Sequence, residues 1–211
     1  INTVTVRSGA AHASSGLDFT MIDMEHTPYD SNRLQEYLLG MVNKRRILAK
    51  GNLQPDVMPM VRLPSNGREH VQHMIKQVLD IGMFGVLLPH INTREEALWA
   101  VRSMRYPQRL GAPDMEPRGQ RGVGYGWAAR YWGMIGREYT DRADLWPLDP
   151  KGDLLLFIMI ESSEAVANIE EIVRVPGIGG VFLGPGDLSF SLGVDESDPL
   201  VEEATQKVLA A

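Results

Sequence analysis

The sequence predicts an α/β fold, and within that class a (β/α)8 TIM barrel that lacks its last two βα units. Three observations support this prediction. Short apolar runs alternate with amphipathic segments along the chain, which is typical of parallel strands joined by helical crossovers. Most of these runs are apolar at nearly every position, as in strands buried on both faces. Each strong run is also followed by a polar or ionisable residue, as expected where several strands supply side chains to one barrel mouth.

Five strong strands and one weak strand are expected. The strong candidates cover residues 19–23, 58–62, 85–89, 154–161 and 180–184, and the weak candidate covers residues 3–6. An eight-stranded barrel needs about 250 residues, and this chain has 211. We therefore expect residues 1–211 to form a single (β/α) barrel domain that is incomplete at its C-terminus.

The segments between these strands place apolar residues at helical spacing. The predicted helices cover residues 33–48, 67–80 and 165–173, a segment that follows Thr93, and a segment from Pro199 to the chain end. Thr93 and Glu96 form a capping box, and Asp198 precedes a proline at the first helical position. Both features mark helix starts.

A doubly wound sheet would show the same alternation of strands and helices. Such a sheet concentrates its binding residues at one switch point, usually beside a glycine-rich turn after the first strand. No G-x-G-x-x-G motif occurs in the first half of this chain. Because polar residues instead follow every strong strand, the barrel is favoured.

The composition excludes several classes of protein. Apolar residues make up 44% of the chain and charged residues 23%, which is ordinary for a globular protein. Cysteine is absent, so there is no disulfide framework, thiolate metal site or cysteine nucleophile. A net charge of −6 disfavours nucleic acid as a partner. No apolar run approaches the roughly 20 residues that span a bilayer, and no signal peptide opens the chain. We expect a cytoplasmic protein with no membrane partner.

Two acids that follow neighbouring strands are the candidate metal ligands. Glu161 ends one predicted strand, and Asp187 follows the next. Carboxylate oxygens suit Mg²⁺ or Mn²⁺, with Co²⁺ a further candidate. The turn before Asp187 contains Gly184 and Gly186, which let backbone N–H groups approach a ligand such as a carboxylate.

Three further residues complete the candidate site. Arg62 offers a planar cation for a carboxylate or a developing oxyanion. Asp23 and His26 lie three positions apart at a strand end, so Asp23 could orient the imidazole of His26 as a general base. A metal, a cation and a base can together generate and hold an enolate. Each residue alone also fits an ordinary structural role, and only the joint pattern indicates a site. His90, at another strand end, could contact it.

Lysine placement argues against Schiff-base chemistry. The chain has five lysines, at positions 44, 50, 76, 151 and 207, and none of them ends a predicted strand. A Schiff-base aldolase needs a desolvated lysine in the barrel mouth. Carbon–carbon bond chemistry in this chain would therefore depend on a metal.

The motifs IDMEH, MPMVR, PRGQRGVG and GPGDLS occur in this order between residues 16 and 193. In this respect the chain resembles the HpcH/HpaI family of metal-dependent (class II) pyruvate aldolases. The IDMEH and GPGDLS blocks in that order are the most specific. The resemblance implies a carbon–carbon lyase that forms or cleaves 4-hydroxy-2-oxo acids from pyruvate, or another 2-oxo acid, and an aldehyde. It also implies a homo-oligomer, as in the hexamers of the family.

The resemblance assigns a role to each candidate residue. It implies that Glu161 and Asp187 bind the divalent metal cation, and that the backbone N–H groups of Gly186 and Asp187 bind the substrate carboxylate. Arg62 would stabilise the enolate and contact the substrate. His26, with Asp23 behind it, would act as the base.

The chain departs from the family pattern at two places within the matched residues. Met159 stands two positions before the metal glutamate, where the family commonly has glutamine. Residues 108–116 form an insertion whose role is open. Six aromatic residues follow it between positions 125 and 146, and they fit either packing in a helical excursion or subunit interface, or a wall that selects the aldehyde.

Two other functions stay open at this point. A related lyase acting on a CoA ester or a citrate-type acid could use the same barrel, and it would need a basic groove for the CoA phosphates. A non-catalytic barrel that binds a metal and a keto acid is the other alternative.

Overall fold

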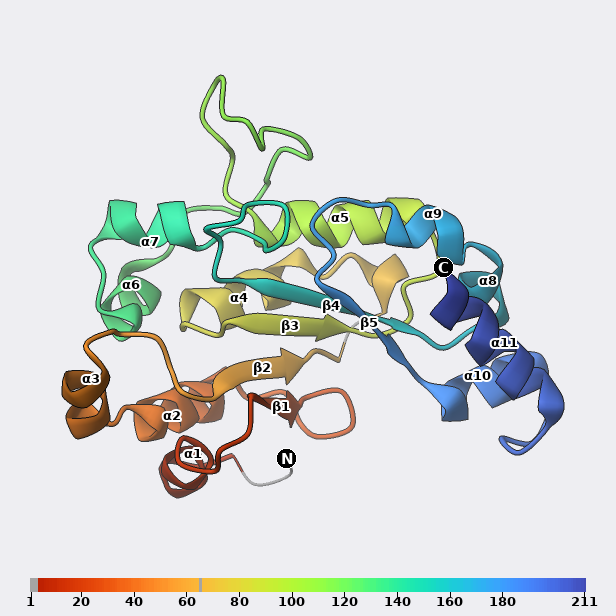
Figure 1. The fold of residues 1–211 in the computed structure, drawn as a ribbon, viewed down its shortest axis with the longest axis horizontal. Coiled ribbons are helices and arrows are strands. Elements are labelled where there is room, and N and C mark those ends of the chain that lie inside the picture. The colour runs from red at the N-terminus through yellow and green to blue at the C-terminus, as the bar shows by residue number, and fades with distance from the viewer. Residues whose placement is uncertain (1–3, 65) are drawn as a thin grey trace.

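Five parallel strands form one sheet in the computed structural model of this chain, which describes residues 4–64 and 66–211. The strands follow one another in the sheet in sequence order and are β1 (Phe19–Asp23), β2 (Met58–Arg62), β3 (Gly85–Leu88), β4 (Leu155–Ile160) and β5 (Gly180–Leu183). All five correspond to the strong predicted strands. The arrowheads in Figure 1 show that their carboxyl ends meet at one end of the molecule.

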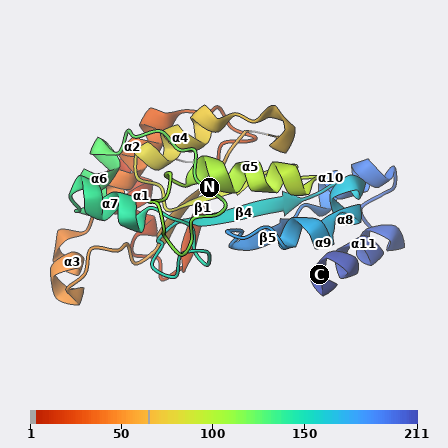
Figure 2. The same cartoon turned by 90° about the horizontal axis from the view of Figure 1, so that it is seen from above.

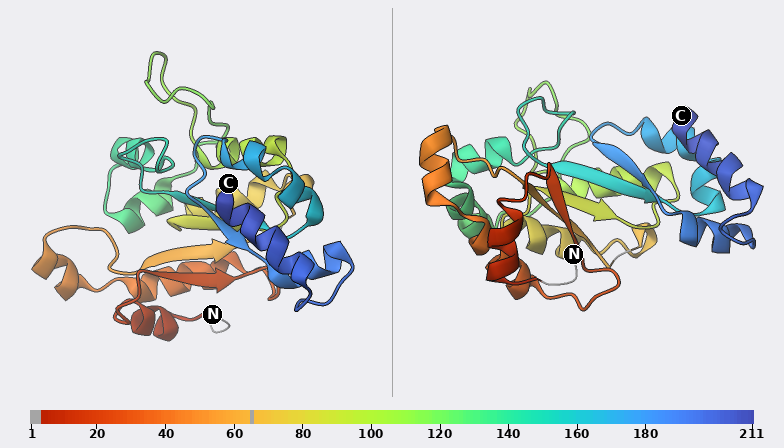
Figure 3. Two further views of the ribbon diagram at one scale, coloured as in Figure 1. Left: turned by 45° about the vertical axis from the view of Figure 1, so that its right-hand side comes forward. Right: turned by 60° about the horizontal axis from the view of Figure 1, so that its bottom comes forward.

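Helices pack against one face of this sheet and lie beyond its ends (Figures 1 and 2). The helices are α1 (Val6–His12), α2 (Ser31–Met41), α3 (Lys44–Lys50), α4 (Gln72–Asp80), α5 (Arg94–Met104), α6 (Gly126–Trp132), α7 (Gly136–Arg142), α8 (Ser163–Ala167), α9 (Ile169–Val173), α10 (Pro185–Leu192) and α11 (Pro199–Ala210), with a 3-10 turn η1 at Gly67–Glu69. Figures 2 and 3 show α8, α10 and α11 grouped beyond the carboxyl ends of the strands, and α3 at the opposite end. None of the helices in the described ranges is both long and apolar enough to cross a bilayer.

These residues do not form a closed barrel. The sheet is an open half-barrel with β1 and β5 at its two edges. Burial on both faces, which the sequence predicts for most of the strong strands, is wrong at these edges: Phe19 is 46% exposed and Phe182 is 47% exposed. The physical reason is that the inner face of a barrel is covered only when the sheet closes on itself. Five parallel strands leave that face open.

The weak strand at residues 3–6 is also wrong for the part that the structure describes. Thr3 lies outside the described residues, and Val6 already begins α1. Thr5 caps this helix, because its side chain accepts a hydrogen bond from the N–H of Ser8 while Ser8 bonds back to Thr5. This reciprocal cap stabilises a helix start where the apolar pattern indicates a strand.

The predicted helices are correct in position but not always continuous. The helix at 33–48 is interrupted where Val42 is extended, and Asn43 then caps α3 by accepting from the N–H of Arg46 at 3.0 Å. The helices at 67–80 and 165–173 are each divided in two as well. The predicted turn at residues 184–187 is a helix start, with Pro185 at the first position of α10. Local caps decide these breaks, and hydrophobic spacing does not show them.

The core lies between the sheet and the helices that follow its strands. Its fully buried members from the strands and from three of these helices include Ile22, Val61, Val86, Leu156, Ile158, Leu34, Leu38, Ile75, Leu79, Ala97 and Val101. Each large aliphatic side chain buried here contributes about 1.5–3 kcal/mol. This packing makes the sheet a rigid support for the loops at its ends.

The 108–116 insertion belongs to a loop that projects from the body of the protein after α5 (Figure 1). Its base is held by Arg105, which is fully buried. The guanidinium of Arg105 donates to Asp114 Oδ2 at 2.6 Å, to Asp144 Oδ1 and Oδ2 at 2.5 and 2.7 Å, and to the carbonyl of Pro117 at 2.9 Å. One buried cation therefore connects the insertion to the loop before β4.

The aromatic residues between 125 and 146 support the packing interpretation. Trp132 stacks on Phe84 with ring centroids 4.1 Å apart, and its Nε1 donates to the carbonyl of Gly82 at 3.0 Å. Tyr139 is fully buried and donates to the carbonyl of Leu79 at 3.1 Å. Because Gly82 and Phe84 precede β3, these rings lie at the amino ends of the strands, so they do not line the end where Glu161 lies.

Candidate active site

The residues that the sequence selects do gather at the carboxyl end of the sheet. Asp23 is the last residue of β1, and Arg62 is the last residue of β2 and lies directly beside it in the register. Glu161 follows β4, and Asp187 lies in the first turn of α10 after β5. Parallel pairing brings these four strand ends to one edge, which is the reason that residues distant in sequence can act together.

Glu161 is the most buried acid of this group, with 1% of its surface exposed. Its Oε1 accepts a hydrogen bond from the backbone N–H of His90 at 2.7 Å. Burial raises the pKa of the Glu161 carboxyl, although the hydrogen bond from His90 offsets part of that rise. The nearby carboxylates of Glu25 and Asp187 raise this pKa further. A buried acid surrounded by other acids is stabilised by a cation.

Three side chains at this end have the arrangement of a metal site. One ligand atom from each of His90, Glu161 and Asp187 lies within 4.8 Å of the other two. A cation with bonds of about 2.1 Å holds its ligands within about 3–4.2 Å of one another, so the group is close to that size. Two carboxylates and one imidazole are also a suitable donor set for a divalent cation. The residues present therefore fit a divalent cation.

Gly184 makes room for this cluster. A Cβ at position 184 would lie 2.5 Å from Oε2 of Glu161, which is closer than any real contact. The absence of a side chain there keeps Oε2 accessible from the start of α10. This close approach is a physical reason for the glycine that opens the GPGD segment.

The start of α10 also lies at this end of the sheet (Figure 1). The N–H of Leu188 bonds to the carbonyl of Gly184 at 3.0 Å, and Pro185 has no N–H. Gly186 and Asp187 lie in the first turn, where N–H groups have no partner within the helix. This is the position predicted for binding the substrate carboxylate, and the start of a helix favours an anion.

Arg62 is held by two acids. Its Nε and Nη2 donate to the two carboxylate oxygens of Asp23 at 3.0 and 2.7 Å, and its Nη1 lies 2.9 Å from Oε2 of Glu25. Hydrogen bonding to Asp23 raises the pKa of Arg62. Partial burial favours the neutral form of Asp23, but the hydrogen bonds from Arg62 and from the backbone of Glu25 outweigh it and hold the pKa of Asp23 below its usual value. The guanidinium is thus kept charged and oriented.

His26 is brought to the same loop, but its ring has a different neighbour from the predicted one. Oδ1 of Asp23 accepts the backbone N–H groups of Glu25 and His26 at 3.0 and 3.4 Å. Nε2 of His26 instead lies 3.4 Å from Oε2 of Glu25, and 65% of the His26 side chain is exposed. Asp23 therefore orients the backbone of His26 and the guanidinium of Arg62, while Glu25 lies beside the imidazole.

The sequence gives Glu25 no role in the site, and it marks His90 only as a residue that could contact the site. Burial raises the pKa of Glu25, and the charge of Arg62 offsets part of this. His90 has a left-handed backbone with φ of 51°, a conformation that costs a non-glycine residue energy and is often found at functional sites. The available signal was position, because His90 directly follows a predicted strand and Glu25 lies two residues after another, inside the IDMEH motif.

Another acidic group lies far from this site. Ligand atoms of Asp114, Asp144 and Asp149 also lie within 4.8 Å of one another. Asp114 and Asp144 already form ion pairs with the buried Arg105. We interpret Asp114 and Asp144 as the counter-charges of Arg105, because their carboxylate oxygens already bind its guanidinium.

The profile of the HpcH/HpaI aldolase/citrate lyase family matches residues 8–211. The chain belongs to this family. The resemblance carried by the IDMEH and GPGDLS motifs is thus confirmed over nearly the whole length of the chain.

Curated members of the HpcH/HpaI family are similar to this chain. A 2-keto-3-deoxy-L-rhamnonate aldolase of Klebsiella pneumoniae is 35% identical over 94% of the chain, and that of Escherichia coli K12 is 33% identical over 100% of it. The chain spans 65% of the first relative and 70% of the second. Both relatives are named as aldolases, which are carbon–carbon lyases, as the sequence resemblance implied.

Solved HpcH/HpaI structures share the fold. A family protein from Burkholderia cenocepacia J2315 superposes with a TM-score of 0.77 at 32% identity, covering 100% of this chain and 72% of the other. An HpcH/HpaI aldolase from Desulfitobacterium hafniense DCB-2 gives 0.73 at 25% identity, covering 99% and 70%.

Met159 is the departure from the HpcH/HpaI pattern that lies closest to Arg62. Its Sδ lies 4.0 Å from Nη1 of Arg62, and the side chain is 97% buried, with 3% exposed. A thioether is a weak acceptor, so it leaves Nη1 without a strong partner on that side.

Proposed function

We propose that this chain carries the site of a divalent-metal-dependent aldolase that forms or cleaves 4-hydroxy-2-oxo acids through the enolate of pyruvate or a related 2-oxo acid. The observation that carries the proposal is the group formed by His90, Glu161 and Asp187, with Arg62 on the neighbouring strand end. Aldol chemistry needs both a means of holding a 2-oxo acid and a means of stabilising negative charge on its keto oxygen. The curated relatives act on 2-keto-3-deoxy-L-rhamnonate by name, which suggests sugar-derived 2-oxo acids as the substrate class.

Glu161 and Asp187 would hold the cation, with His90 as a third ligand. When bound, Mg²⁺, Mn²⁺ or Co²⁺ would act as a Lewis acid toward the keto oxygen of the substrate. The N–H groups of Gly186 and Asp187 at the start of α10 would bind the substrate carboxylate. This assignment uses donors and acceptors that already face one end of the sheet.

Arg62 would stabilise the developing enolate oxygen. Its charge is secured by Asp23 and Glu25, so little reorganisation is needed when negative charge develops. His26 would exchange the proton, because its ring lies at the same loop and an imidazole can both accept and donate a proton. Asp23 would position it through the backbone hydrogen bond at 3.4 Å.

We also propose that this half-barrel is part of a (β/α)8 barrel. Its support is the open inner face, where Phe19 and Phe182 are about half exposed. We also include a homo-oligomer, as the family resemblance implies. A CoA-ester or citrate-type lyase is less supported, because the similar curated proteins are 2-keto-3-deoxy-L-rhamnonate aldolases.

Deuterium exchange tests this proposal without knowledge of the aldehyde. Pyruvate in D₂O with the protein and Mn²⁺ should lose its methyl proton signal, because enolate formation exchanges those protons. The exchange should stop with EDTA and return when Mn²⁺ is restored. Binding of pyruvate without any exchange would instead indicate a non-catalytic keto-acid-binding protein.

A further inference from the structure

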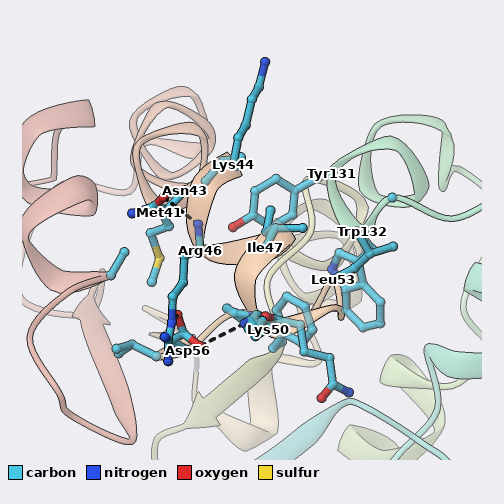
Figure 4. Close-up of a pocket in the computed structure, with 17 residues that line it drawn as sticks. Met41, Asn43, Lys44, Arg46, Ile47, Lys50, Leu53, Asp56, Tyr131 and Trp132 are labelled. Atoms are coloured by element: carbon cyan, nitrogen blue, oxygen red, sulfur yellow. Dashed lines mark hydrogen bonds and ion pairs between the residues drawn. The ribbon is translucent and has the colours of Figure 1, made fainter.

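A cavity lies at the amino end of the sheet, between α3 and α6 (Figure 4). We call it the α3–α6 cavity, and its volume is about 270 Å³. Its apolar wall includes Ile47, Leu53, Phe84 and Trp132. Pockets for drug-sized ligands start at about 300 Å³. This slightly smaller cavity therefore suits a ligand with a single aromatic ring.

The α3–α6 cavity is separate from the candidate active site. Val57 and Phe84 line it and directly precede β2 and β3, whereas Arg62 ends β2. Five strand residues of about 3.3 Å each place roughly 16 Å between the two ends. A ligand in this cavity would therefore not touch the aldol site.

The polar side of the cavity carries more positive than negative charge. Nε of Arg46 and Nζ of Lys50 each lie 2.9 Å from one oxygen of Asp56. Lys50 also donates to the carbonyl of Gln54, and only 15% of its side chain is exposed. Two cations share one carboxylate, which leaves one positive charge in excess. In Figure 4 the side chain of Lys44 points away from this group.

A neutral donor completes the lining. Tyr131 stands over Ile47 in Figure 4, and within the described residues its hydroxyl has no hydrogen-bond partner. Burial raises the pKa of this phenol, so it stays protonated at neutral pH. Its O–H is available to a ligand that brings an acceptor.

We propose that the α3–α6 cavity binds a small aryl carboxylate, with the ring against Leu53 and the stacked Phe84–Trp132 pair and the carboxylate beside Lys50 and Arg46. The cavity matches such a ligand in both shape and charge. The apolar wall removes the ring from water, and the excess charge compensates the carboxylate. The hydroxyl of Tyr131 offers an additional donor.

Calorimetric titration with phenylacetate tests the proposal, and phenylacetamide serves as the neutral probe of the same shape. Phenylacetate should bind saturably, at least about tenfold more tightly than the amide. Lys50→Met should weaken phenylacetate binding by about tenfold, whereas Lys207→Met, the same change on the distant helix α11, should leave it unaltered. Asp56→Asn should act in the opposite direction and tighten binding several-fold, because it removes the competing carboxylate.

Two further measurements separate this proposal from its rivals. Leu53→Trp fills the cavity from a position that is 51% exposed, so it should abolish binding while the thermal unfolding temperature stays close to that of the unchanged protein. Equal binding of acid and amide, or indifference to both Lys50→Met and Asp56→Asn, would overturn the proposal. A change in the sedimentation of Leu53→Trp, with no phenylacetate binding by either protein, would show that this face is an interface between copies instead.

Discussion

The carboxylate of Glu161 accepts the backbone N–H of His90 at 2.7 Å, and both residues contribute to one group of possible metal ligands. This hydrogen bond joins the loop after β3 to the end of β4. It uses Oε1 of Glu161, while Oε2 faces the space kept open by Gly184. The same residue therefore shapes the loop and offers an oxygen to a cation.

Glu161→Gln should separate these two roles. The amide oxygen can still accept from His90, so we expect the unfolding temperature without metal to change little. Metal affinity should fall by more than the roughly 10–100-fold that loss of an outer-shell partner costs, because a charged ligand is lost. Titration with Mn²⁺ measures the affinity. Glu164→Gln, three positions along and exposed, is the control and should leave it unaltered.

Arg62→Lys should lower turnover far more than metal affinity. Lysine keeps the charge but cannot make the paired contacts with both oxygens of Asp23. We expect kcat to fall by about 10²–10³-fold, measured as methyl-proton exchange of pyruvate, with Mn²⁺ binding within a few-fold. Arg174→Lys, at the exposed C-cap of α9, is the matched control. Equal losses of turnover and metal affinity would assign Arg62 a structural role.

His90→Gly and His90→Ala should differ in stability and agree in metal binding. Both remove the imidazole, so both should weaken Mn²⁺ binding. Glycine accepts the φ of 51° at this position without strain, whereas alanine does not. We therefore expect His90→Gly to be more stable than His90→Ala by about 1 kcal/mol. Urea unfolding measures this difference, and equal stabilities would show that the backbone here is not strained.

Asp23 and Glu25 should change the pH dependence of folding stability in opposite directions. The pKa of Asp23 is lowered by folding from 3.8, so its contribution to stability is present above that value and is lost as pH falls through the folded-state pKa. The pKa of Glu25 is raised from 4.5, so its ionisation opposes folding increasingly as pH rises above that value. Thermal melts between pH 3 and 6 should show this. Asp23→Asn should reduce the loss of stability in acid, and Glu25→Gln should reduce the loss toward neutral pH.

Asp144→Ala should be among the most destabilising single changes in the chain. It would leave the fully buried guanidinium of Arg105 without its main partner. Breaking such a buried pair costs about 3–5 kcal/mol. Asp141→Ala breaks the exposed pair with Arg109 and should cost at most about 1 kcal/mol. Urea unfolding of both variants makes the comparison, and equal costs would mean that Arg105 finds other partners.

Much of the candidate site could be predicted because strand ends are visible in a sequence. Apolar runs identified all five strands, and parallel pairing then requires their carboxyl ends to meet. This reasoning is sufficient to bring Arg62, Glu161 and Asp187 to one end. It fails for the break at Val42 and Asn43, because a local cap competes there with a helical pattern that continues through it.

The sequence by itself determined the order of the strands, the absence of cysteine and lysine at the strand ends, and the acids and the arginine that lie there. Only the tertiary structure decided that Glu25 pairs with Arg62, that His90 joins the metal-ligand group, and that Arg105 holds the insertion. These contacts depend on backbone dihedral angles and on packing between distant segments. Neither is encoded in the spacing of apolar residues, so they appear only when the chain is folded.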